Sequence, residues 1–133
     1  ASLSERLASA AQLDAIGINL QRKDKRSKTT EKLKKAKTLQ LNFSIARNVT
    51  AQSGMKTVYV RITSPTGATL AGGGSFSYEN RNLECSMKRT FEYNGNETPI
   101  TLYWNINQAM VQGNYKVSIF ADGNMIGSKS FNL

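Results

Sequence analysis

Hydrophobic residues at every second position are the feature that most restricts the fold of this sequence. The stretch TLQLNFSIA at 38–46 alternates Leu, Leu, Phe and Ile with polar residues, so an extended strand would be apolar on one face only. KTVYVRIT at 56–63 and ITLYWN at 100–105 repeat the pattern. Strands of this kind bury one face each, which predicts antiparallel sheets packed in two layers.

Further segments carry the same signal between turn residues. They are DAIGINLQR (14–22), SFSYE (75–79), LECSMKRTFEY (83–93) and GNYKVSIFADGNMIGSKSFNL (113–133). In the first of them, Ile16, Ile18 and Leu20 are expected to face the core. Short strands at this spacing, with no helix between them, predict an all-β fold, an immunoglobulin-like antiparallel β-sandwich of about 7–8 strands.

The last segment is expected to form a hairpin, because Asp122-Gly123 is a strong tight-turn signal. Tyr115 opens this hairpin, at the place where immunoglobulin-like folds carry a tyrosine corner. Trp104 is a natural core aromatic for the same fold.

The first residues follow a different period. LSERLASAAQL at 3–13 has apolar residues three and four apart, which is typical of a helix. We therefore divide the chain into the end of a helical or coiled-coil stalk at 1–12 and a β-sandwich at 13–133, with a basic loop at 22–37.

That basic loop holds half of the positive charge of the chain. Nine of the 18 Lys and Arg residues lie in it, with two of the nine acids, and the whole chain carries +9. The candidate polyanion-binding residues are Arg22, Lys23, Lys25, Arg26, Lys28, Lys32, Lys34, Lys35 and Lys37.

Two interpretations of this loop compete. Such a cluster can neutralise phosphates of DNA or anionic lipid and give salt-dependent binding. It lacks a residue on which a base could stack, because no aromatic residue precedes Phe43. We favour a solvated connection between two strands, with a short helical turn at TTEKLKKA (29–36).

Catalytic chemistry has little support in the composition. There is no His, which removes His-dependent triads and His-metal sites. The single Cys85 is expected to be a buried structural residue, and Gly72–Gly74 a flexible loop rather than a phosphate loop. We predict no enzyme activity, no catalytic or metal-binding residues and no cofactor; a hydrolase built from the scattered carboxylates is a minor alternative.

Side chains that the alternation places on outward faces are the candidates for contact with another protein. They are Tyr59, Arg61, Tyr103 and Phe120. The alternative is that a second layer of the domain covers them.

The order of motifs resembles a bacterial family. The segments that carry the likeness are LDAIGINLQRK, KAKTLQLNFSIARNVTAQSGMKTVYVRITSP, FSYENRNLECSMKRTFEYNGNETPITLYWN and FADGNMIGSKSF. They resemble the C-terminal domain of Bacteroidetes proteins built from a membrane helix, a long coiled coil and a β domain, often labelled chromosome-segregation or chromosome-partitioning proteins.

The resemblance implies an architecture and a location. It implies a domain carried on a membrane-anchored coiled coil, outside the cytoplasm in the periplasm, with a cytoplasmic location as the alternative. It also implies homo-oligomers formed through the upstream coiled coil. It supplies no catalytic residues.

Two functions follow as hypotheses. The first is a non-enzymatic protein-interaction or structural module at the cell envelope, with an unknown protein partner. The alternative is binding of DNA or anionic lipid through residues 22–37, which would agree with a chromosome-segregation label.

Overall fold

The described residues form nine antiparallel strands and one short 3-10 helix. The computed structural model describes residues 12–26, 28–30 and 32–133. The elements are β1 (Ala15–Lys23), η1 (Leu33–Lys35), β2 (Thr38–Ile45), β3 (Gly54–Thr63), β4 (Ser75–Tyr78), β5 (Arg81–Glu84), β6 (Met87–Tyr93), β7 (Thr98–Asn105), β8 (Asn114–Ala121) and β9 (Asn124–Asn132). The all-β prediction is confirmed, and so is the short helical turn, which is η1.

The predicted helical stalk lies outside the described residues, except for Gln12, which is not helical. Within the described ranges there is no helix with the length and apolar character needed to cross a membrane.

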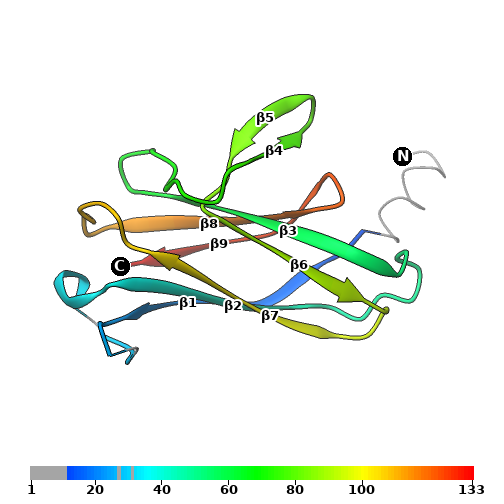
Figure 1. Cartoon of the computed structure of the whole chain (residues 1–133), viewed down its shortest axis with the longest axis horizontal. Helices are drawn as coiled ribbons and strands as arrows, with labels where there is room; N and C mark the ends of the chain where they lie inside the picture. The colour runs from blue at the N-terminus through cyan, green and yellow to red at the C-terminus, as the bar shows by residue number, and fades with distance from the viewer. Residues whose placement is uncertain (1–11, 27, 31) are drawn as a thin grey trace.

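Two sheets form the body of the domain (Figure 1). One has the strand order β1-β2-β7 and the other β6-β3-β8-β9, while β4 and β5 form a separate hairpin. One hydrophobic cluster joins the two sheets and includes the predicted inward residues of β2, β3 and β7. These are Leu39, Leu41, Phe43, Ile45, Val58, Val60, Ile62, Ile100, Leu102 and Trp104.

The strand β1 departs from its predicted face. A bulge between Ile16 and Asn19 places an extra residue opposite β2, and Gly17 takes a positive φ of 64° there. The inserted residue shifts the alternation, so Ala15 is buried and Ile16 is 38% exposed. The prediction that Ile16 faces the core is therefore wrong, while Leu20 beyond the bulge is buried as expected.

The segment LECSMKRTFEY is also two strands rather than one. The strand is interrupted between β5 and β6 at Cys85 and Ser86, both of which are buried. The Ser86 hydroxyl accepts a 2.9 Å bond from the Ile62 amide and donates to the Leu70 carbonyl. These bonds satisfy a buried polar group at the point where the chain crosses from one hydrophobic cluster to the other.

The second cluster lies under the β4–β5 hairpin. Phe76, Cys85 and Phe120 are buried in it, and Tyr59 and Tyr78 pack beside them. The rings of Tyr59 and Phe76 stack with centroids 4.7 Å apart. The hairpin thus covers part of the outer face of β3 and β8, and the prediction of a buried Cys85 is confirmed.

The glycine run at the base of this hairpin is a close backbone crossing. The Gly73 amide donates to the Cys85 carbonyl at 3.0 Å, and the Cys85 amide donates to the Gly74 carbonyl at 2.9 Å. A Cβ on Gly73 would lie 2.7 Å from the Met87 nitrogen. The expectation of a flexible loop at Gly72–Gly74 is replaced by a hydrogen-bonded crossing that needs glycine.

Candidate anion-binding groove

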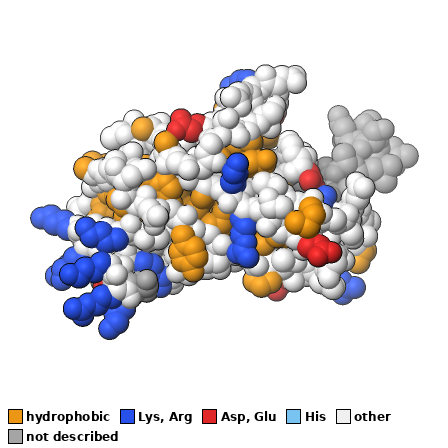
Figure 2. Space-filling view, viewed as in Figure 1, with side chains coloured by type: hydrophobic (Ala, Val, Ile, Leu, Met, Phe, Trp, Pro, Cys, Tyr) orange, Lys and Arg blue, Asp and Glu red, His pale blue; other side chains and the backbone are white. Residues whose placement is uncertain are grey.

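The basic loop gathers at one end of the sandwich (Figure 2). Seven of the nine candidate cations are exposed, and the other two, Arg22 and Lys23, are half-buried at the end of β1. The exposed residues are Lys25, Arg26, Lys28, Lys32, Lys34, Lys35 and Lys37. The structure thus brings the predicted cations together on one surface.

Backbone hydrogen bonds order this loop against the sheet. The Thr30 amide donates to the Arg22 carbonyl at 2.9 Å, and the Lys37 amide donates to the Lys23 carbonyl at 2.7 Å. Thr29 also forms an antiparallel bridge with Lys23, so the middle of the loop folds back on the end of β1. The loop is a folded extension of the sheet.

Asp24 organises the tip of the loop. Its Oδ1 accepts bonds from the backbone amides of Arg26 at 2.8 Å and Lys28 at 3.0 Å. The Lys28 amide, then the Arg26 amide, hold the pKa of the Asp24 carboxyl below its usual value, since both donate to the charged form. The Asp24 carboxylate thus accepts hydrogen bonds from backbone amides, as in an Asx turn.

A groove opens between the basic loop and the β7–β8 connection. Its volume is about 1040 Å³. One wall is residues 32–37, with η1 in the middle, and the other is residues 106–112. The two walls lie side by side because β2 and β7 are hydrogen-bonded neighbours. Thr38 at the start of β2 pairs with Asn105 at the end of β7, so the segments before β2 and after β7 leave the sheet at the same end.

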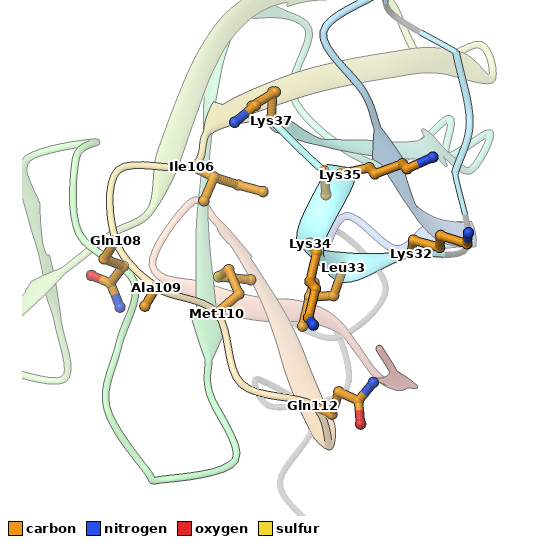
Figure 3. Close-up of a pocket in the computed structure, with 11 residues that line it drawn as sticks. Lys32, Leu33, Lys34, Lys35, Lys37, Ile106, Gln108, Ala109, Met110 and Gln112 are labelled. Carbon is orange, nitrogen blue, oxygen red and sulfur yellow. The ribbon is translucent and has the colours of Figure 1, made fainter.

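The groove has an apolar floor and a cationic rim (Figure 3). Leu33, Ile106 and Met110 lie around its centre, and the latter two also pack against the main core. The ammonium groups of Lys32 and Lys35 are exposed and point away from the groove on the η1 side. An anionic partner that buries apolar atoms in the groove would meet these charges where it extends over η1.

No ion pair compensates this rim in the part of the chain that is described. The one salt bridge found there joins Lys56 and Asp122 at 2.8 Å, on β3 and the β8–β9 turn. Exposed like charges repel one another at separations below the Debye length of about 8–10 Å. The basic end is thus a concentrated positive potential available to an anion.

The remaining chemistry of the described residues is sparse. They include no group of three or more His, Cys, Asp or Glu side chains that could hold a metal ion. Among residues 12–26, 28–30 and 32–133, no Asp or Glu lines the groove or a smaller hollow beside Trp104. Burial raises the pKa of the Cys85 thiol, which favours its protonated form.

Comparison with known proteins assigns the chain to a family. The family model of a domain of unknown function, DUF8428, matches residues 12–133. The chain belongs to the DUF8428 family. No curated protein matches the sequence.

The DUF8428 chain is also similar in structure to a known protein. A solved structure of Pseudomonas fluorescens alkylpurine DNA glycosylase AlkC, bound to DNA containing an abasic site analog, superposes with a TM-score of 0.54 and 14% identity. The match covers 92% of the DUF8428 chain and 30% of the glycosylase chain. At this identity the likeness concerns the fold alone, and the chain spans less than a third of that enzyme.

The candidate protein contacts do not form one site in the DUF8428 domain. Phe120 is only 4% exposed, so the expectation of an outward contact residue is wrong there. Its position on the outer face of β8 follows the alternation, but the β4–β5 hairpin packs over that face. Tyr59 is half-buried by the same hairpin, which is the covering layer considered as the alternative.

The other two candidates differ from each other. Arg61 is half-buried and donates from Nε to the Glu84 carbonyl at 2.9 Å and from Nη2 to the Thr69 hydroxyl at 3.1 Å, so it ties the hairpin to β3. Tyr103 is 62% exposed on β7. Of the four, Tyr103 alone presents most of its side chain to a partner.

Sequence reasoning missed the second wall of the groove. Ile106, Gln108, Met110 and Gln112 lie in a connection without clear periodicity. The available signal was a Met and two Gln residues between two confirmed strands. These residues do not indicate a binding site unless β7 is known to lie beside β2.

Proposed function

We propose that this DUF8428 domain is a non-enzymatic binding module that takes an anionic partner at its basic end. One observation carries the proposal: seven exposed cations are held by hydrogen-bonded backbone at one end of the domain, four of them lining an open groove. A merely solvated connection does not require such order, and the mutual repulsion of its charges would be relieved by a bound anion.

We infer further that the scaffold is an immunoglobulin-like sandwich. The strand orders β1-β2-β7 and β6-β3-β8-β9 correspond to A-B-E in one sheet and C-F-G with an added strand in the other. Tyr115 at the start of β8 donates from its hydroxyl to the Val111 carbonyl at 2.6 Å, four residues upstream. This bond has the form of a tyrosine corner.

Display on a coiled coil at the cell envelope is part of the same proposal. The described chain enters the sandwich at Gln12, whose side-chain amide donates to the Met125 carbonyl at 3.2 Å beside the β8–β9 turn. β1 then runs lengthwise to the basic end, which lies opposite (Figure 1). A stalk joined at Gln12 would leave the groove facing away from it, free to meet a partner.

Nucleic acid or anionic lipid is the second candidate ligand. The charge of +9 favours it, because binding to phosphate arrays scales with the number of cations engaged. The DNA in the glycosylase structure adds nothing to this candidate, since the likeness concerns fold. For either ligand the basic end is the surface to test.

The test is a fluorescence-anisotropy titration against a labelled random DNA duplex at low and near-physiological salt. The test variant changes Lys32, Lys34 and Lys35 to Gln. A control of equal net charge changes Arg47, Arg81 and Lys88, which are exposed outside the basic loop, to Gln.

We expect the wild type and the control to bind with a steep salt dependence, about four to five decades of affinity per decade of salt if about five phosphates are engaged. The test variant should lose roughly three units of that slope. Equal weak binding by all three proteins would return the basic segment to a solvated connection.

A further inference from the structure

We infer that the groove takes a short acidic peptide segment carrying an aliphatic side chain as its anchor. This inference rests on the proposed function, because it names the partner of the same basic end. It follows from the two kinds of surface that meet in the groove, the apolar floor and the cationic rim.

The floor calls for an apolar group. Leu33 is half-buried without belonging to the main core, and Ile106 and Met110 each turn one side to the core and one side to the groove. A partner side chain of the size of Leu would remove these surfaces from water, which stabilises a complex by about 25 cal/mol per Å² of apolar area. Met110 adds a side chain that adapts to different shapes.

The lysines of the rim call for carboxylates before and after that anchor along the partner peptide. Lys32, Lys34, Lys35 and Lys37 line the groove along the η1 wall. Gln108 and Gln112 stand exposed on the opposite wall, and their amides can both donate to and accept from a peptide backbone. Cations on one wall and amides on the other suit an extended acidic segment laid between them.

Nucleic acid fits the groove less well. None of the described residues that line it is aromatic, so it offers no platform on which a base could stack. The apolar floor would have no counterpart on a phosphate backbone.

A membrane surface also fits less well. Binding to lipid headgroups with apolar insertion needs apolar side chains that protrude beyond the charged ones. In this groove Leu33, Ile106 and Met110 are half-buried, whereas the lysines that line it are exposed.

The test compares two labelled peptides of equal charge. One is a short run of Glu and Asp around a central Leu-Leu pair, and its twin has Ser-Ser at the centre. Both are titrated against the wild type, the Lys32, Lys34 and Lys35 to Gln variant, and Leu33→Gln, beside the DNA duplex and vesicles of an anionic phospholipid. Circular dichroism melting checks that each variant is folded.

We expect the wild type to bind the Leu-Leu peptide about tenfold or more tightly than its twin, since burial of one Leu side chain is worth about 1.5–3 kcal/mol. Leu33→Gln should remove most of this preference and leave the affinity for the Ser-Ser peptide unchanged. The lysine variant should weaken both peptides.

Each contrary outcome has a distinct meaning. Equal binding of the two peptides, with no effect of Leu33→Gln, overturns the anchor and leaves the anion site standing. Tighter binding of DNA or vesicles than of the Leu-Leu peptide at near-physiological salt assigns the groove to that ligand. Binding of none of the four probes removes the proposed function together with the inference.

Discussion

The backbone amide of Ile106 donates a 2.9 Å hydrogen bond to the carbonyl oxygen of Lys37. This bond lies just beyond the last pair of the β2–β7 ladder, Thr38 with Asn105, and joins the two walls of the groove where they leave the sheet. The position of the groove is thus tied to the strand pairing of the sandwich, and its shape depends on the side chains of two connections.

Neutralising the rim should cost the fold nothing. In the variant with Lys32, Lys34 and Lys35 changed to Gln, the melting temperature at low salt should equal or exceed that of the wild type, because mutual repulsion of exposed cations is relieved. Added salt should narrow the difference by screening the remaining charges. Differential scanning calorimetry at two salt concentrations measures both effects, and a clear loss of stability would show that these lysines support the loop.

Removing the Tyr115 hydroxyl should destabilise the domain. Tyr115→Phe leaves the Val111 carbonyl without its donor, at a cost of about 1–2 kcal/mol, which lowers the melting temperature by about 3–6 °C. The matched control is Tyr103→Phe on the exposed face of β7, which should change stability by less than about 0.5 kcal/mol. Similar melting of the two variants would show that the bond from the Tyr115 hydroxyl does not stabilise the fold.

The same tyrosine predicts a pH dependence. Burial raises the pKa of Tyr115 above its ordinary value of 10.0. Above pH 10 the unfolded chain releases this proton while the folded chain keeps it, so the stability contributed below that pH is lost as pH rises toward the folded pKa. Urea unfolding between pH 9 and 11 should show a shallower loss of stability for Tyr115→Phe than for the wild type, and parallel curves would contradict the assignment.

Gly73→Ala should be among the most damaging of small changes. The new Cβ would lie 2.7 Å from the Met87 nitrogen and 2.8 Å from its Cα, and both are backbone atoms that cannot turn aside. Overpacking of this kind costs about 1–3 kcal/mol. Gly127→Ala is the informative comparison, because its Cβ meets the Ala15 side chain at 2.9 Å.

The double variant Gly127→Ala with Ala15→Gly should therefore recover part of the stability lost by Gly127→Ala alone. No equivalent side-chain truncation should rescue Gly73→Ala. Chemical denaturation of the wild type, the two single glycine variants and the double variant distinguishes a side-chain clash at Gly127 from a backbone clash at Gly73.

Loosening the β4–β5 hairpin should expose the buried thiol. Phe76→Ala removes the ring that stacks on Tyr59 and touches Phe120, so the hairpin should open more often. Labelling of Cys85 by a thiol reagent under native conditions should accelerate on the order of tenfold, the effect of about 1.4 kcal/mol on local opening. Tyr103→Ala should leave the labelling rate unchanged, and equal rates for the two variants would mean that the hairpin does not guard Cys85.

The alternation of residues was sufficient to predict most of the sandwich. The buried faces of β2, β3 and β7 follow directly from it, because a strand with one apolar face has one way to sit on a core. The bulge at Gly17 was not predictable, since one inserted residue leaves the alternation of letters intact and changes only what stands opposite. Phe120 was misplaced for a related reason, because its cover comes from a hairpin distant in sequence.

Half of the groove was predictable and half was not. The charge of the segment 22–37 is visible in composition, and so were the lysines of one wall. The second wall depends on the pairing of β2 with β7, which are separated by four other strands along the chain. No local pattern in residues 106–112 indicates that they lie beside the segment before β2.

The placement of Gln12 and the groove at opposite ends of the sandwich affects how the domain would respond to force. With the chain held at Gln12 and a partner pulling on the groove, tension acts along the strands of β1-β2-β7, from one end of the sandwich to the other. Hydrogen bonds of a ladder loaded in this direction share the force, whereas a ladder pulled from its side opens one bond at a time. Because forced unfolding is governed by the unfolding rate, this geometry would slow unfolding under such a load if the proposed stalk and partner act at these two ends.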